Sequence, residues 1–297
     1  MSQEKSVWTT IALLIGVFFI PTSTAFADAV DQRLAELPAQ VQERTREMIR
    51  AGVDAEDAVQ LVQSMRADRF EPEEMLKAQA IVLEARAEGI PSRPVINKAL
   101  EGVAKQVPPE RTLQAMETVR SRYAFAYGQA RSLVDQKGDS EYLGNLLAES
   151  LAAGFRPEDA SHVVSRLREL SRKLGQDQLN DLAAACLALL RDMSRLGVES
   201  NLSAQVISEA VSRGFSTDEI ASMHQSMLAQ AQTHSAQSVA QGFAQAMQQG
   251  QTGHGMSSPG QSSASGSGSP GGMGGSGGAG GGGGAGGSGG PGGGGSR

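Results

Sequence analysis

A short pattern recurs along the chain and limits what it can fold into: a glycine, an apolar residue, and then the start of a helix. It reads Gly-Val-Asp-Ala-Glu-Asp from Gly52, Gly-Phe-Arg-Pro-Glu-Asp from Gly154 and Gly-Phe-Ser-Thr-Asp-Glu from Gly214. A glycine that follows a helix can take the left-handed conformation that closes the helix, and acids favour the N-terminal turn of the next one. The pattern therefore predicts helices joined by very short turns.

Four further segments share this turn in part. Two keep the glycine and two replace it; they begin at Gly89, Gly197, Arg69 and Gln106. The apolar residue of the turn is spaced to pack against the fourth residue of the next helix, as with Phe155 and Ala160. Ser216 and Glu219 have the spacing of a capping box at one of the helix starts.

The spacing of the turns is regular. It is 17 residues from Gly52 to Arg69, from Gly89 to Gln106 and from Gly197 to Gly214. We predict pairs of a short and a longer helix that begin near Gly52, Gly89, Gly138 and Gly197, with a capping helix over 38–51 and an extra helix over 177–196. Such repetition favours an all-α, solenoid-like or irregular helical stack over residues 28–250. A single compact helical bundle is the alternative.

The N-terminus has the layout of a secretory signal. Lys5 precedes an apolar run from Ile11 to Ile20, and Ala25-Phe26-Ala27 supplies the small residues of a cleavage site. The alternative is a retained anchor, but the run is shorter than the roughly 20 residues that a spanning helix needs. We predict that residues 1–27 are removed and that the mature protein is periplasmic or secreted, with no membrane span.

The C-terminal segment 251–297 holds 24 of the 37 glycines and contains no Leu, Ile, Val or aromatic residue. Such a composition cannot bury a core, so we predict a disordered Gly/Ser-rich tail. An inert spacer is one interpretation, and adhesion outside the cell is the other.

Composition excludes several classes of protein. The formal net charge of −6 argues against a dedicated nucleic-acid binder, which would show a basic face. The single cysteine, Cys186, excludes an internal disulfide and a multi-cysteine zinc site, and its apolar surroundings predict a buried, unreactive thiol. Outside the Gly/Ser-rich tail the sequence contains no nucleophile elbow pattern, and the tail glycines make no phosphate-binding loop because they follow no strand and lead into no helix. We therefore predict no enzyme, no catalytic residue and no cofactor.

Soft-metal binding is the alternative function. Met223, His224 and Met227 fall within one helical turn, and His234 follows. Thioether and imidazole ligands suit Cu(I), which an exported protein could meet. The same two methionines also fit a core-facing stripe, so core packing competes with this reading.

One segment concentrates basic and aromatic residues outside the recurring turns. We predict that it forms a contact patch for a protein partner in the cell envelope, because Tyr and Arg are enriched at interface hot spots. The alternative is a long helix that packs its tyrosines against its neighbours. The residues of the predicted patch are Arg120, Arg122, Tyr123, Phe125, Tyr127 and Arg131.

The recurring turns, together with Gly-Ile-Pro at Gly89 and Val-Pro-Pro-Glu-Arg at Val107, resemble uncharacterised exported bacterial proteins built from helical repeats. The resemblance covers roughly residues 45–225. It implies a helical-repeat fold and an envelope setting, and it transfers no active site. The predicted function is that of a non-catalytic protein-interaction or structural module.

Overall fold

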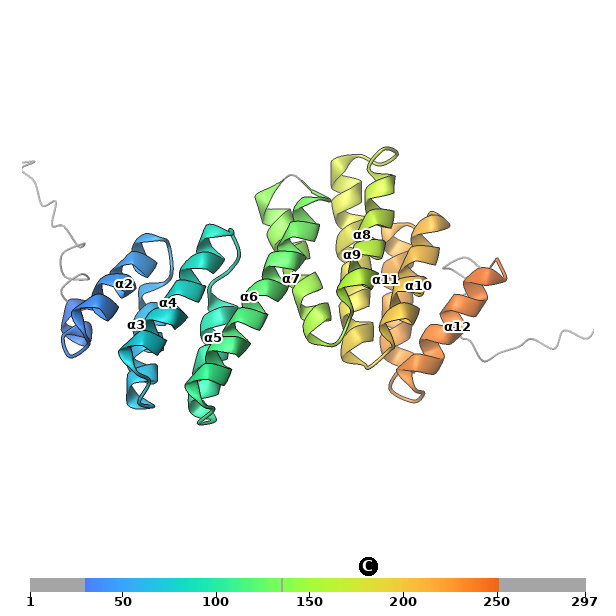
Figure 1. Ribbon diagram of the computed structural model, residues 1–297. Helices are drawn as coiled ribbons and strands as arrows, with labels where there is room; N and C mark the ends of the chain where they lie inside the picture. Colours follow the sequence, from blue (N-terminus) through green and yellow to red (C-terminus); the bar gives the residue numbers. More distant parts are fainter. Residues whose placement is uncertain (1–29, 135, 251–297) are drawn as a thin grey trace, which may run out of the picture. The chain divides into compact units, whose positions relative to one another are not determined.

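The computed structural model describes residues 30–134 and 136–250, and the regular elements within them are α-helices (Figure 1). They are α2 (Ala39–Arg50), α3 (Ala55–Ala67), α4 (Pro72–Ala87), α5 (Arg93–Ala104), α6 (Pro109–Arg131), α7 (Lys137–Ala152), α8 (Pro157–Leu170), α9 (Gln176–Arg195), α10 (Ser200–Ser212), α11 (Thr217–Gln230) and α12 (Ala236–Gln248). The all-α helical stack is thus confirmed. The predicted signal peptide and Gly/Ser-rich tail lie outside the described residues. None of the helices described is long and apolar enough to cross a bilayer.

The helices stack by contacting the next helix but one. The even-numbered helices follow one another in this way from α2 to α12, and among the odd-numbered helices α3 contacts α5, α7 contacts α9, and α9 contacts α11. The step from α5 to α7 is the exception, since these two helices make at most marginal contact. The even-numbered helices thus make one layer of the stack and the odd-numbered helices the other.

The recurring turn is a Schellman motif, as its glycine predicted. In each copy the amide of the apolar residue donates to the carbonyl five residues earlier: Val53 to Met48, Phe70 to Met65, Ile90 to Ala85, Val107 to Gly102, Phe155 to Ser150, Val198 to Met193 and Phe215 to Ala210. The residue before it has positive φ, for example +101° at Gly154. The two turns without glycine adopt the same conformation, with φ of 61° at Arg69 and 52° at Gln106. The motif satisfies the last carbonyls of one helix before the next begins.

Prolines and capping residues stand at the starts of several helices. Pro72, Pro109 and Pro157 occupy the first position of α4, α6 and α8. At α11 the capping box forms, because the amide of Glu219 donates to the Ser216 hydroxyl and the amide of Ser216 donates to the Glu219 carboxylate. Short turns that both end and start helices leave little freedom for the connections, which makes the stacking order follow the chain order.

Polar side chains join helices that are next but one along the stack. The pairs are Gln79 with Thr45, Arg93 with Asp57, Arg120 with Glu84, Gln129 with Ser161, Arg195 with Glu149, Ser200 with Asp159, and His224 with Asp192. Within the described residues no such hydrogen bond or ion pair joins α5 to α7. This absence of a polar contact falls at the step from α5 to α7, where the two helices also make little contact.

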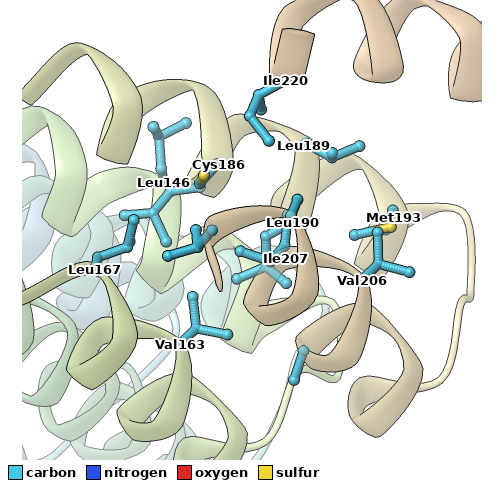
Figure 2. Close-up of a cluster of buried hydrophobic side chains, with 14 of the residues drawn as sticks. Leu146, Val163, Leu167, Cys186, Leu189, Leu190, Met193, Val206, Ile207 and Ile220 are labelled. Carbon is cyan, nitrogen blue, oxygen red and sulfur yellow. The ribbon is translucent and has the colours of Figure 1, made fainter. Parts of the chain in front are cut away.

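The core divides at the same place. One apolar cluster is built from residues between Leu34 and Tyr127, and the other from residues between Ala126 and Met247. Figure 2 shows the centre of the second cluster, where Leu190, Ile207 and Val163 come from three different helices. Both clusters draw on α6, so this helix belongs to two cores. The polar outer side of α12, with Gln241 and Gln245 exposed, closes the C-terminal end of the stack.

The helix pair predicted to begin near Gly138 is present as α7 and α8, and the helix predicted over 177–196 is present as α9, but two details differ from the prediction. Gly138 does not end a helix but lies in the first turn of α7, and its φ is not positive. The helix expected to be extra is α9, which contacts α7 and α11 and therefore belongs to the regular alternation. The order of a short helix and then a longer one does not hold throughout, since α7 has 16 residues and α8 has 14.

We expect Arg69→Gly to raise the free energy of unfolding by about 0.5–1 kcal/mol, because glycine avoids the cost of about 1–2 kcal/mol that an L-residue incurs at positive φ. Gly154→Ala is the matched reverse change, since no atom lies within 4 Å of an added Cβ there and only backbone strain is introduced. It should lower the free energy of unfolding by about 1 kcal/mol. Urea unfolding measures both. A destabilised Arg69→Gly variant would contradict this account of the turn.

Candidate functional site

Two of the six residues of the predicted patch attach α6 to α4. Arg120 forms ion pairs with Glu84, Glu88 and Glu117. The hydrogen bond to Glu117 is the largest influence that raises the pKa of Arg120, and the charges of Glu117 and Glu88 add to it. Arg131 donates to the backbone carbonyl of Glu88 at 3.0 Å, in the turn that ends α4. These arginines are therefore part of the helical stack.

The Arg131 contact has a counterpart one repeat earlier. Arg86, in the last turn of α4, donates to the carbonyl of Ala51 at 3.2 Å, in the turn that ends α2. An added Cβ at Gly52 would lie 3.0 Å from the guanidinium of Arg86. In both cases a cation from one helix binds the C-terminal carbonyls of the neighbouring helix, where the helix dipole favours positive charge.

Tyr127 is buried at the contact between α6 and α7. Its side chain is only 3% exposed, and its hydroxyl donates to Asn145 of α7 at 2.9 Å. An added Cβ at Gly144 would lie 2.5 Å from the Tyr127 ring, so glycine is needed there for the two helices to approach. Burial raises the pKa of Tyr127 to about 12. The assignment of Tyr127 to a partner-binding surface is therefore corrected: the ring packs inside the protein.

The remaining three residues are half-buried. Tyr123 packs against both apolar clusters, with its ring centre 6.1 Å from that of Tyr127, and burial raises its pKa. Phe125 packs against the C-terminal cluster only. The buried Nε of Arg122 has no hydrogen-bond partner. The structure thus distributes the six residues between an α4 contact, the α6–α7 contact and a partly exposed remainder, and a binding role for Arg122, Tyr123 and Phe125 stays a prediction.

A cluster of charged side chains joins α7, α9 and α11. Arg195 and Arg191 of α9 lie 2.8 Å and 3.8 Å from a carboxylate oxygen of Glu149 on α7. Asp192 accepts hydrogen bonds from Arg191 at 2.8 Å and, at 2.8 Å, from Nε2 of His224 on α11. Burial would raise the pKa of Asp192, but the hydrogen bonds from Arg191 and His224 outweigh it and lower the pKa. The carboxylate is thus ionised, so Nε2 of His224 carries the proton in this contact.

The large apolar side chains that are exposed in the described part of the chain lie on the same three helices. Tyr142 of α7 is 55% exposed, Leu196 at the end of α9 is 42% exposed, and Leu228 of α11 is 40% exposed. Leu196 and Leu228 each follow a member of the contacting pair Asp192 and His224 by four residues, which is about one helical turn. We call this surface the α7–α9–α11 face: Tyr142, Glu149, Arg191, Asp192, Arg195, Leu196, His224 and Leu228.

The side chains considered for copper are separated by burial. Met223 and Met227 are 1% and 0% exposed and belong to the C-terminal apolar cluster, whereas His224 is paired with Asp192 and His234 is exposed. Within residues 30–134 and 136–250 no group of three or more His, Cys, Asp or Glu side chains is placed to hold a metal ion. Met223 and Met227 fill the core stripe that competed with the copper reading.

Comparison with known proteins gives no family assignment: no family model, curated protein or solved structure matches the chain. The site must therefore be argued from its own residues. Sequence reasoning missed the α7–α9–α11 face, whose members are scattered from Tyr142 to Leu228. The signal that could have found it is Tyr142, a tyrosine at a polar position of α7. It lies seven residues before Glu149, which places both residues on the same side of that helix.

Gly144→Ala should lower the free energy of unfolding by about 1–3 kcal/mol, because the new methyl group would overlap the Tyr127 ring. Gly128→Ala, in α6, is the matched control: its Cβ meets no atom within 4 Å, and alanine favours helix by up to about 1 kcal/mol. Thermal and urea unfolding compare the two variants. Equal effects would show that the α6–α7 contact does not require glycine.

Cys186 should not react with a thiol reagent at pH 8 in the folded protein. It is fully buried on α9, between Leu146 and Leu189 in Figure 2, and burial raises its pKa to about 12. The thiolate is the reactive form, so both access and ionisation are suppressed. Labelling followed by mass spectrometry should show modification only after unfolding in urea. Rapid labelling of the native protein would contradict the packing of this cluster.

Proposed function

We propose that the protein is a non-catalytic, exported protein-interaction module that binds a protein partner in the cell envelope through the α7–α9–α11 face. The observation that supports this is that the exposed large apolar side chains of the described residues lie on the three helices that a charged cluster with two arginines joins. Tyrosine and arginine are enriched at protein interfaces, and an exposed apolar patch bordered by polar groups is typical of them.

The architecture suits such a role. The three helices of the face are held side by side by Arg195 with Glu149 and by His224 with Asp192, at 2.8 Å in both cases. The charges of Glu149 and Asp192 balance those of Arg191 and Arg195, so the face presents oriented polar groups without a large net charge. A surface fixed in this way loses little conformational entropy when it binds, which favours affinity.

The proposal of export is supported by the sequence of residues 1–27. The proposal that the protein is not a catalyst is supported by the polar groups of the face, which already form hydrogen bonds with one another. Asp192 is held by Arg191 and His224, and Glu149 by Arg195. A general base needs a free position toward its substrate, and a nucleophile needs an adjacent base. The cluster therefore supports a structural and recognition role better than a catalytic one.

The test is site-specific photocrosslinking in the native envelope with a photoreactive residue at position 142, 196 or 228. The same partner should be captured from all three positions. The matched control positions are Gln40 and Glu43 on α2, which are exposed on a different part of the stack. Capture from α2 but not from the α7–α9–α11 face would reject the assignment of this surface.

Charge reversal tests the same surface by affinity. Arg195→Glu should weaken binding of the captured partner at least tenfold, because it leaves Glu149 beside a second carboxylate and inverts a charge within the interface. Arg66→Glu is the control: this arginine has a similar exposure, 48% against 52%, and pairs with Glu36 in the N-terminal half. Equal loss in both variants would indicate general electrostatic attraction instead of this face.

A further inference from the structure

A pocket of about 430 Å³ lies between two inter-helix turns of the C-terminal half. Its walls come from the connection between α8 and α9, from the first half of α9, and from the end of α10 with the Schellman turn that follows it. The apolar side chains that line it are Leu170, Leu174, Leu182, Val211 and Phe215. This volume falls within the range of about 300–1,000 Å³ that is typical of small-molecule sites.

The mouth of this pocket lies beside a basic segment. Residues 166–173 carry Arg166, Arg168, Arg172 and Lys173 but only one acid, Glu169, in a chain whose formal net charge is −6. Arg166 pairs with Glu169 at 3.1 Å, and no ion pair engages the other three cations among the described residues. Lys173 itself lines the pocket. An exposed, unpaired ammonium group next to an apolar cavity is complementary to a ligand with an anionic head and an apolar body.

We propose that this pocket binds a single-chain anionic amphiphile of the fatty-acid class. Its carboxylate would lie at Lys173, and its chain would lie against Leu174, Leu182 and Phe215. The pocket has the volume of a small-molecule site, which favours one chain over the row of side chains that a partner helix would insert. The site is separate from the α7–α9–α11 face, so it adds a ligand to the proposed interaction module.

The test is calorimetric titration of the purified protein with octanoate, decanoate and dodecanoate below their micelle concentrations. Affinity should rise about fourfold for each added methylene as the chain fills the pocket. Dodecyltrimethylammonium, which has the same chain and the opposite charge, should bind at least fivefold more weakly than dodecanoate. Lys173→Gln should weaken dodecanoate binding two- to fivefold and leave the cationic amphiphile unaffected.

Matched variants separate the pocket from unspecific adsorption. Leu174→Trp should weaken dodecanoate binding at least tenfold by filling the cavity, whereas Leu76→Trp, at a half-buried leucine of α4 outside it, should not. Lys77→Gln, on α4, is the control for the lysine. No binding of dodecanoate up to millimolar concentration, equal binding of the two head groups, or equal effects of the paired variants would overturn the proposal. Because the chain-length series uses the unmodified protein, the test does not depend on the folding of any variant.

Discussion

The contact between Tyr127 of α6 and Gly144 of α7 is the interaction on which the rest of the structure depends. Apart from this contact, the helices are least connected here, since α5 and α7 make little contact and no hydrogen bond or ion pair among the described residues joins them. The two apolar clusters meet at this point, with Ala126 in one and Tyr127 in the other. Because glycine removes the side chain that would overlap the ring, α6 and α7 approach closely enough to join both cores. Tyr127, which the sequence predicts as a binding residue, is therefore a buried residue that connects the two cores.

Arginines join neighbouring helices on both sides of this contact. On the N-terminal side Arg86 binds the carbonyl of Ala51 and Arg120 pairs with Glu84 and Glu88, and on the C-terminal side Arg195 pairs with Glu149. Among the described residues, the exposed large apolar side chains Tyr142, Leu196 and Leu228 lie on the C-terminal side, on the helices that the cluster of Glu149, Arg191 and Asp192 joins. The proposed recognition and ligand sites both lie in this second half, on different parts of α9.

Most of the fold could be predicted from the sequence because its determinants are local. The left-handed residue, the apolar residue after it and the acids or proline that follow are neighbours in the chain, so Gly154-Phe155-Arg156-Pro157 predicts a helix end and a helix start together. The pairing of helices could not be predicted in the same way. It depends on contacts such as Tyr127 with Gly144 and His224 with Asp192, which are far apart in sequence. Composition alone cannot distinguish a tyrosine that packs inward from one that faces solvent, which is why the sequence predicts Tyr127 at a surface and does not single out Tyr142.

Hydrogen exchange measured by mass spectrometry across a urea titration tests the central claim most directly, because it reports on α3–α4 and on α9–α10 in the same sample. If α6 and α7 join the two cores into one cooperative unit, amides from both halves should lose protection at the same urea concentration. Two separate midpoints in the unmodified protein would contradict the account, since they would show that each cluster folds independently of the α6–α7 contact.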